Sequence, residues 1–282
     1  MRFVLIFVAL LLIIVLSYSD GEIMSYSEID KKTKLHELST VKKTIAVIGG
    51  KGGVGKSTVT SMLAVTMQRR GLSAAILDAD ITGASVPHAF GLKGTLDGTS
   101  EGVFPMFSKF GIQIVSMNLL LSSPTEPVVW RGAALSSYVR SFWSKIIWTD
   151  VDVMFIDMPP GTGEVPLTVL SEFPIDGIVV VITPQKLACD VAEKAVKMAE
   201  SLNIPILGLV ENQSYFICSD CKKKLFPYGE STAEEFAEKF SVPLFSRIPV
   251  NKDIALWEDR GLIELFEGDY LDSFCDGLEK LW

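Results

Sequence analysis

The chain has 282 residues, and its 26 lysines and arginines against 34 aspartates and glutamates give a net charge of −8. This balance argues against a nucleic-acid partner, because an acidic surface repels the phosphate backbone. Hydrophobic residues make up 48% of the sequence and charged residues 21%, which excludes a disordered chain. Four cysteines are too few for a disulfide scaffold, and two histidines leave little room for a histidine-rich metal site or a Ser-His-Asp triad.

The first part of the chain is an apolar segment from Phe3 to Leu16, with Arg2 before it and Asp20 after it. It is shorter than the roughly 20 residues that span a bilayer as a helix. It fits a secretory signal, a short membrane anchor, or a segment omitted when translation starts at Met24. We expect an apolar leader at 1–23, a polar extension at 24–43 and one globular domain at 44–282.

Short apolar runs alternate with amphipathic stretches in the rest of the chain. The runs expected to form strands are 44–48, 74–77, 112–116, 153–156, 177–182, 206–210 and 244–248. The stretches expected to form helices are 56–70, 133–147, 187–202, 232–240 and 270–281. Because uninterrupted apolar strands are typical of parallel sheets buried on both faces, this order predicts an α/β fold with a doubly wound, mostly parallel sheet flanked by helices. A stretch rich in Gly, Pro and Ser, 83–108, is expected to be a functional loop region.

The most specific motif is GGKGGVGKST, from Gly49 to Thr58, which contains the phosphate-loop pattern G-x-x-x-x-G-K-[ST]. It follows an expected buried strand and precedes an expected helix, which is the context that this motif requires. Its glycines let backbone N–H groups converge on phosphate oxygens, and the helix N-terminus adds positive potential. We expect Lys56 to reach the β- and γ-phosphates and Ser57 to ligate Mg²⁺. The expected ATP-binding residues are Gly50, Lys51, Gly52, Gly53, Val54, Gly55, Lys56, Ser57 and Thr58.

A second lysine, Lys51, stands inside the loop, and on the pattern alone it could simply be an exposed loop residue. The pattern K-G-G-x-G-K-[ST] resembles the deviant Walker A motif of the MinD/ParA/nitrogenase-iron-protein class. The resemblance implies that Lys51 reaches across a nucleotide-sandwich dimer to the phosphates of the partner. There it would add positive charge where charge spreads in the phosphoryl-transfer transition state.

Aspartates follow two of the expected strands, where ligands of open α/β sheets bind. Asp157 fits the position that holds a Mg²⁺-bound water, and Asp80 fits a residue that orients or activates the attacking water. Asp78 is equally well explained as a turn or helix-capping residue. Gly161 and Gly163 would let the segment after Asp157 respond to the γ-phosphate.

Cys218 and Cys221 form a C-x-x-C pair in a loop after the expected strand at 206–210. Structural zinc and iron–sulfur clusters usually need four ligands, and two subunits that each donate a C-x-x-C pair would supply these four. A redox dithiol and incidental cysteines are the alternatives, although the redox motif normally opens a helix and this pair does not. Cys189 and Cys275 stand alone and are expected to be buried small side chains.

Six motifs make the resemblance more specific, and from about Thr44 to Leu262 the chain resembles the Mrp/ApbC group of P-loop ATPases, which assemble or carry iron–sulfur clusters. In chain order they are GGKGGVGKST, DADITG, VVWRG, FIDMPPGTGE, VVVITPQ and VENQSYFICSDC. The resemblance implies a homodimer that binds ATP and Mg²⁺, hydrolyses ATP slowly and serves apo iron–sulfur acceptor and scaffold proteins. It further implies a labile 4Fe–4S cluster bridged by Cys218 and Cys221 of both subunits, and contact between Asn212 and adenine.

The sequence departs from the family pattern after the cysteine pair, and two alternative functions stay open. Residues 222–224 are three lysines where the family is usually Gly-rich, so the details of cluster binding or partner contact stay open. A MinD/ParA-like nucleotide-switched positioning ATPase is one alternative, but it would need a basic C-terminal helix or a basic patch, whereas the C-terminal tail is acidic. A regulatory ATPase dimer with structural zinc at the cysteines is the other alternative. Since a labile thiolate cluster requires a reducing compartment, we expect a cytoplasmic protein, tethered to a membrane only if residues 3–16 are retained.

Overall fold

The computed structural model describes residues 32–81, 83, 85–120, 133–229 and 231–281. Among these residues, an eight-stranded sheet has the order β10-β7-β6-β1-β5-β2-β4-β3. Its pairings are parallel except for the antiparallel pair β3–β4 at one edge. Its strands are β1 (Val41–Gly49), β2 (Ala74–Asp78), β3 (Met106–Phe107), β4 (Gln113–Val115), β5 (Val151–Asp157), β6 (Gly177–Ile182), β7 (Ile206–Glu211) and β10 (Phe245–Arg247). The predicted doubly wound, mostly parallel sheet is confirmed.

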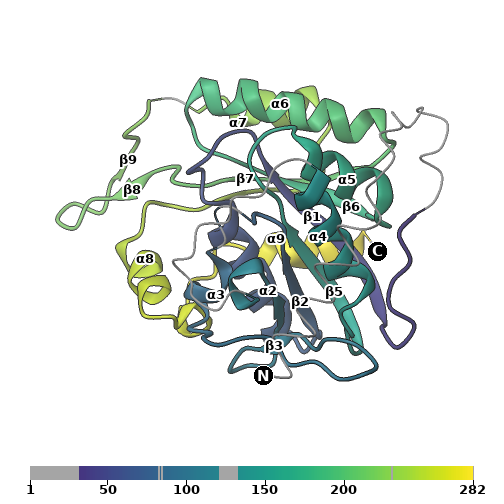
Figure 1. Ribbon diagram of the computed structural model, residues 1–282. Helices are drawn as coiled ribbons and strands as arrows, with labels where there is room; N and C mark the ends of the chain where they lie inside the picture. Colours follow the sequence, from purple (N-terminus) through teal and green to yellow (C-terminus); the bar gives the residue numbers. More distant parts are fainter. Residues whose placement is uncertain (1–31, 82, 84, 121–132, 230, 282) are drawn as a thin grey trace.

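Helices cover both faces of this sheet (Figure 1). One face carries α4 (Ala133–Ser144), α5 (Glu164–Glu172), α6 (Lys186–Ser201) and α7 (Ala233–Lys239). The other carries α2 (Lys56–Arg69), α3 (Val86–Ala89), α8 (Lys252–Asp259) and α9 (Asp272–Lys280). Successive residues of β1 point to opposite cores, Ala46 and Ile48 to one and Ile45 and Val47 to the other. Because both faces are buried, the strands are apolar at every position rather than alternating.

The structure contains each predicted helix and strand, with ends that differ by a few residues. It adds short elements that the sequence pattern does not reveal. They are α3, α5, α8, β3, the 3₁₀ turns Met117–Leu119 and Ile263–Leu265, and the two-stranded hairpin of β8 (Phe216–Ile217) and β9 (Lys224–Leu225). Helix α5 follows a Pro- and Gly-rich segment and carries Pro166 in its first turn, where a missing N–H breaks no intrahelical bond. Two-residue strands such as β8 and β9 are too short to show any periodicity.

The sheet brings the ends of β1, β2 and β5 together. Strand β1 lies between β5 and β6, and β5 pairs with β2 so that Asp157 stands opposite Asp78. Loops that leave these strands at their carboxyl ends therefore meet at one edge, where open α/β sheets bind ligands. The fold thus places the predicted phosphate loop beside both predicted aspartate segments.

Part of the polar extension packs on the domain. The backbone N–H of Thr33 donates to the carbonyl of Glu172 at 2.7 Å, and the indole N–H of Trp143 donates to the carbonyl of Thr33 at 2.9 Å. The apolar leader at 1–23 and the VVWRG motif at 128–132 lie outside the described residues. None of the helices in the described residues combines the length and the hydrophobicity that a membrane-spanning helix requires.

Candidate functional site

The phosphate loop joins β1 to α2. Gly55, the residue before α2, has φ 82°, a left-handed conformation that glycine adopts without strain. Within the described residues, no side chain caps this end of α2 and its first turn carries no acidic residue. The N–H groups of that turn are therefore available to an anion such as phosphate.

The phosphate loop packs closely against helix α6 at Gly50. A Cβ at Gly50 would lie 2.1 Å from the backbone nitrogen of Ala192 in α6, so the loop passes α6 too closely for any side chain. A Cβ at Gly49 would lie 2.8 Å from Cδ of Lys56, because the Lys56 side chain folds back over the loop. A Cβ at Gly52 would meet nothing within 4 Å. The loop is thus anchored at Gly50 and open at Gly52.

Asp157 ends β5 and is fully buried beside this loop. One carboxylate oxygen accepts a hydrogen bond from the Ser57 hydroxyl at 2.5 Å, and the other accepts one from the Thr60 hydroxyl at 3.1 Å. Burial raises the pKa of Asp157 to about 6, while the Ser57 hydroxyl and the Lys56 ammonium act in the opposite direction. A buried carboxylate paired with the loop serine is the donor set that holds Mg²⁺ in P-loop NTPases. Sequence reasoning missed Thr60, whose position three residues after Ser57 on the same helix face was the available signal.

Asp78 supports the neighbouring Asp80. Asp78 is fully buried, and its carboxylate accepts the Ser116 hydroxyl at 2.9 Å and the Asp80 backbone N–H at 3.1 Å. Burial and then the charge of Asp157 raise the pKa of Asp78 well above its ordinary value. Asp80 is half-buried, and one of its oxygens accepts the Gly83 N–H at 3.1 Å. Asp78 therefore fixes the turn at Asp80, whose charge lies close enough to Asp157 to act on its pKa. The strand-end position of Asp78 alone left this role undecided.

Asn212, directly after β7, braces the phosphate loop from the other side. It is buried, and its Nδ2 donates to the Val54 carbonyl at 2.9 Å. A Cβ on Gly55 would come within 2.1 Å of that nitrogen. Lys51, by contrast, is exposed. Contact of Asn212 with adenine, and of Lys51 with a second copy, stay predictions.

The cysteine pair lies at the tip of the β8–β9 hairpin, which projects from the body of the molecule (Figure 1). The N–H of Cys218 donates to the Lys223 carbonyl at 3.0 Å, and the N–H of Lys222 donates to the Cys218 carbonyl at 3.0 Å. Backbone N–H groups of Cys221 and Asp220 also hydrogen-bond the Cys218 sulfur and lower the pKa of its thiol. A turn whose N–H groups are directed at a sulfur favours the thiolate that a metal requires.

This pair is incomplete as a metal site. Cys218 is half-buried and Cys221 exposed, and among the described residues no group of three or more His, Cys, Asp or Glu could hold a metal ion. Cys189 and Cys275 are buried, as predicted, and burial raises the pKa of the Cys275 thiol to about 12. The pair does not open a helix, which disfavours a redox dithiol. Within the described residues, the hairpin thus offers a metal two thiol groups, Cys218 and Cys221.

Residues 40–270 match the family model described as NUBPL iron-transfer P-loop NTPase. The chain belongs to this family. The phosphate loop and the uncapped end of α2 lie within the matched residues, and both fit an NTPase of this family.

Curated relatives of this NUBPL-type NTPase are iron–sulfur cluster carrier proteins. Those of Clostridium perfringens and Methanocaldococcus jannaschii are 38% and 39% identical over 232 and 227 residues, which cover 79% and 80% of this chain and 81% and 78% of theirs. That of Aquifex aeolicus is 41% identical over 224 residues, which cover 78% of this chain and 61% of the relative.

Solved structures agree with the fold. The nucleotide-binding protein of Archaeoglobus fulgidus in complex with ADP superposes with a TM-score of 0.75 at 39% identity, covering 83% of this chain and 92% of that one. The cell division ATPase MinD of Pyrococcus furiosus has a TM-score of 0.60 at 19% identity, covering 85% of this chain and 99% of that one, which shows a shared fold alone.

Proposed function

We propose that this NTPase binds and hydrolyses ATP and carries an iron–sulfur cluster between the cysteine hairpins of two copies. One observation carries the proposal: the same chain holds a phosphate loop whose Ser57 hydroxyl donates to the buried Asp157, and a turn that directs N–H groups at the Cys218 sulfur. Relatives 38–41% identical to it are iron–sulfur cluster carrier proteins, which supports the cargo.

On the nucleotide side, residues 50–58 hold the triphosphate, with Lys56 at the β- and γ-phosphates. Ser57 and Asp157 would hold Mg²⁺, which neutralises charge on the phosphate oxygens when bound. Asp80, fixed by Asp78, orients the attacking water. Lys51 is exposed, as a residue that reaches a second copy must be.

On the cargo side, each chain supplies two thiolates at Cys218 and Cys221. A two-fold related pair of chains supplies four, which is the ligand set of a 4Fe–4S cluster. The hairpin is exposed, so acceptor or scaffold proteins can reach it. Such a cluster needs a reducing compartment, and we infer that the protein works in the cytoplasm.

The test is anaerobic reconstitution with iron and sulfide, followed by transfer to an apo-acceptor. We expect a broad absorption near about 400 nm, typical of thiolate-ligated clusters. Replacing both Cys218 and Cys221 by serine should abolish it. Cys189→Ser is the matched control, because Cys189 is buried and contacts Thr232 rather than the hairpin. Unchanged cluster content in the double variant would contradict the assignment of Cys218 and Cys221 as ligands. A protein that retains zinc but no iron or sulfide would show that the cysteines hold zinc instead of a cluster.

A further inference from the structure

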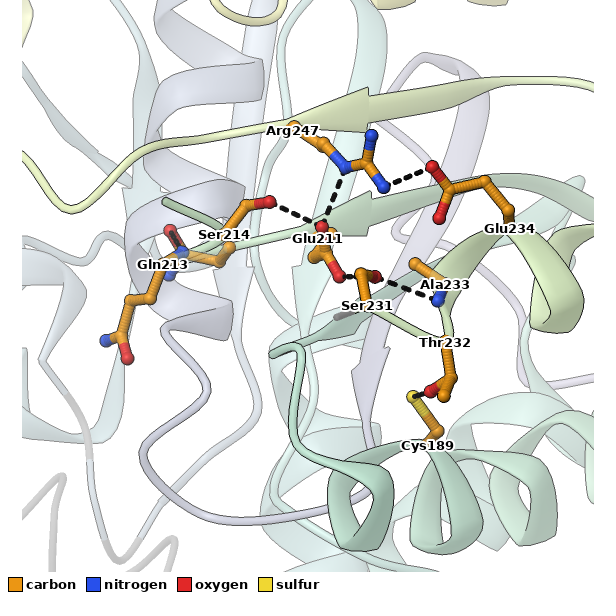
Figure 2. Close-up of polar contacts among 10 residues, drawn as sticks. Cys189, Glu211, Gln213, Ser214, Ser231, Thr232, Ala233, Glu234 and Arg247 are labelled. Atoms are coloured by element: carbon orange, nitrogen blue, oxygen red, sulfur yellow. Dashed lines mark hydrogen bonds and ion pairs between the residues drawn. The ribbon is translucent and has the colours of Figure 1, made fainter. Parts of the chain in front are cut away.

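A fully buried carboxylate, Glu211, lies between the nucleotide loop and the cysteine hairpin and belongs to neither. It is the last residue of β7, directly before Asn212. Figure 2 shows three side chains converging on it from separate segments. The Ser214 hydroxyl donates to Oε2 at 2.5 Å, the Arg247 Nε donates to the same oxygen at 2.8 Å, and the Ser231 hydroxyl donates to Oε1.

The two serines that donate to Glu211 lie at opposite ends of the cysteine hairpin. Ser214 lies just before β8 and Ser231 lies shortly after β9, so one carboxylate holds both ends of the cysteine hairpin. Ser231 Oγ also accepts the N–H of Ala233 at 3.0 Å, at the start of α7. Arg247 from β10 pairs with Glu234 of α7 as well. The base of the hairpin is thus fixed to β7, β10 and α7 through one buried charge.

The same carboxylate adjoins the nucleotide loop. The next residue, Asn212, donates to the Val54 carbonyl in the phosphate loop at 2.9 Å and lies against Gly55. Gln213 then adopts φ 56°, so the chain turns sharply between Asn212 and Ser214. A shift of the loop on binding phosphate would therefore displace Asn212, and with it the carboxylate that holds both ends of the hairpin. Buried, fully hydrogen-bonded charges of this kind form stiff networks, because breaking one contact leaves a charge without compensation.

The geometry points to Glu211 as a positioning residue that transmits the nucleotide state of the phosphate loop to the cysteine hairpin of the same chain. The inference rests on the proposed function only for the identity of the cargo. The carboxylate is suited to this task because both oxygens accept, whereas a glutamine would offer one oxygen to three donors.

The test is hydrogen exchange of residues 216–229 in the metal-free, reduced protein, with and without a non-hydrolysable ATP analogue and Mg²⁺. In the wild type, the analogue should slow this exchange on the order of fivefold or more. Ser231→Ala should bind the analogue with unchanged Kd yet lose that response, because it frees the far end of the hairpin without touching Asn212. Glu211→Gln should behave alike, and Ser231→Ala alone decides the matter if the glutamine variant does not fold.

Two controls are matched to these variants. Thr232 is the residue after Ser231, and Thr232→Val removes its contact with the Cys189 sulfur. Ser219→Ala removes a contact with Asp220 at the hairpin tip. Both should respond to the analogue as the wild type does. A normal response in Ser231→Ala, as expected if a second copy simply covers the hairpin, would overturn the inference, and so would a wild type that does not respond. A hairpin that responds while no cluster is retained on reconstitution would remove the proposed function and leave the coupling standing.

Discussion

Asp157 is buried where the site needs a charge, and this has a consequence for stability. Its pKa in the folded chain is about 6, above the ordinary 3.8, so the native state binds more protons than the unfolded state between these values. Its contribution to stability is therefore fully present below about pH 4 and is lost as the pH rises through about 6. At neutral pH the ionised carboxylate weakens the nucleotide-free fold by on the order of 3 kcal/mol.

Asp157→Asn should accordingly raise the Tm of the nucleotide-free protein at pH 7.5 by about 5 °C, with a smaller gain at pH 5. The same variant should lose Mg²⁺-dependent hydrolysis, because the neutral amide no longer supports the metal. Thermal unfolding at both pH values, with a phosphate-release assay, checks this. A lower Tm at pH 7.5 than that of the wild type would show that the carboxylate stabilises the fold.

Lys51 is exposed and Lys56 is buried, so a substitution at Lys51 can affect hydrolysis without affecting the stability of the fold. Lys51→Ala should lower the rate of hydrolysis on the order of 1,000-fold, as loss of a transition-state cation does, without changing the Tm. Lys93→Ala, at another exposed lysine, is the control. Normal turnover in Lys51→Ala, measured as phosphate release, would remove the sandwich-dimer mechanism.

At the scale of elements, the phosphate loop depends on its contact with α6. Gly50→Ala should destabilise the fold by about 2 kcal/mol or more, because the new Cβ must displace backbone at Ala192. Gly52→Ala enters open space and should change the free energy of unfolding by less than about 0.5 kcal/mol. Denaturant unfolding of the two variants checks this. Equal stabilities would mean that the loop moves away from α6 freely.

Elements with strong periodicity could be predicted, and those fixed by distant contacts could not. The buried strands and α2 follow from apolar runs and the glycine-rich loop between them. For the β8–β9 hairpin the sequence predicts only a loop, because its strands have two residues each and its base is held by Ser214 and Ser231 through Glu211. The role of Glu211 depends on residues up to 36 positions away, such as Arg247, and no local pattern records it.

At the scale of the whole molecule, the fold alone does not decide the function, since MinD shares it at 19% identity. The described part of α9 argues against a surface-binding helix of the positioning ATPases. Its Phe274, Cys275 and Leu278 are at most 3% exposed and lie in the core beside α2. The outer face carries Asp272 and Asp276, which would repel an anionic membrane surface.

The central claim is that one cluster joins two chains, and the mass of the intact reconstituted protein under non-denaturing conditions tests it most directly. The account predicts a species of two chains and one 4Fe–4S cluster, which dissociates to cluster-free single chains when Cys218 and Cys221 are both replaced by serine. A cluster on a single chain, or two clusters on a pair of chains, would contradict it.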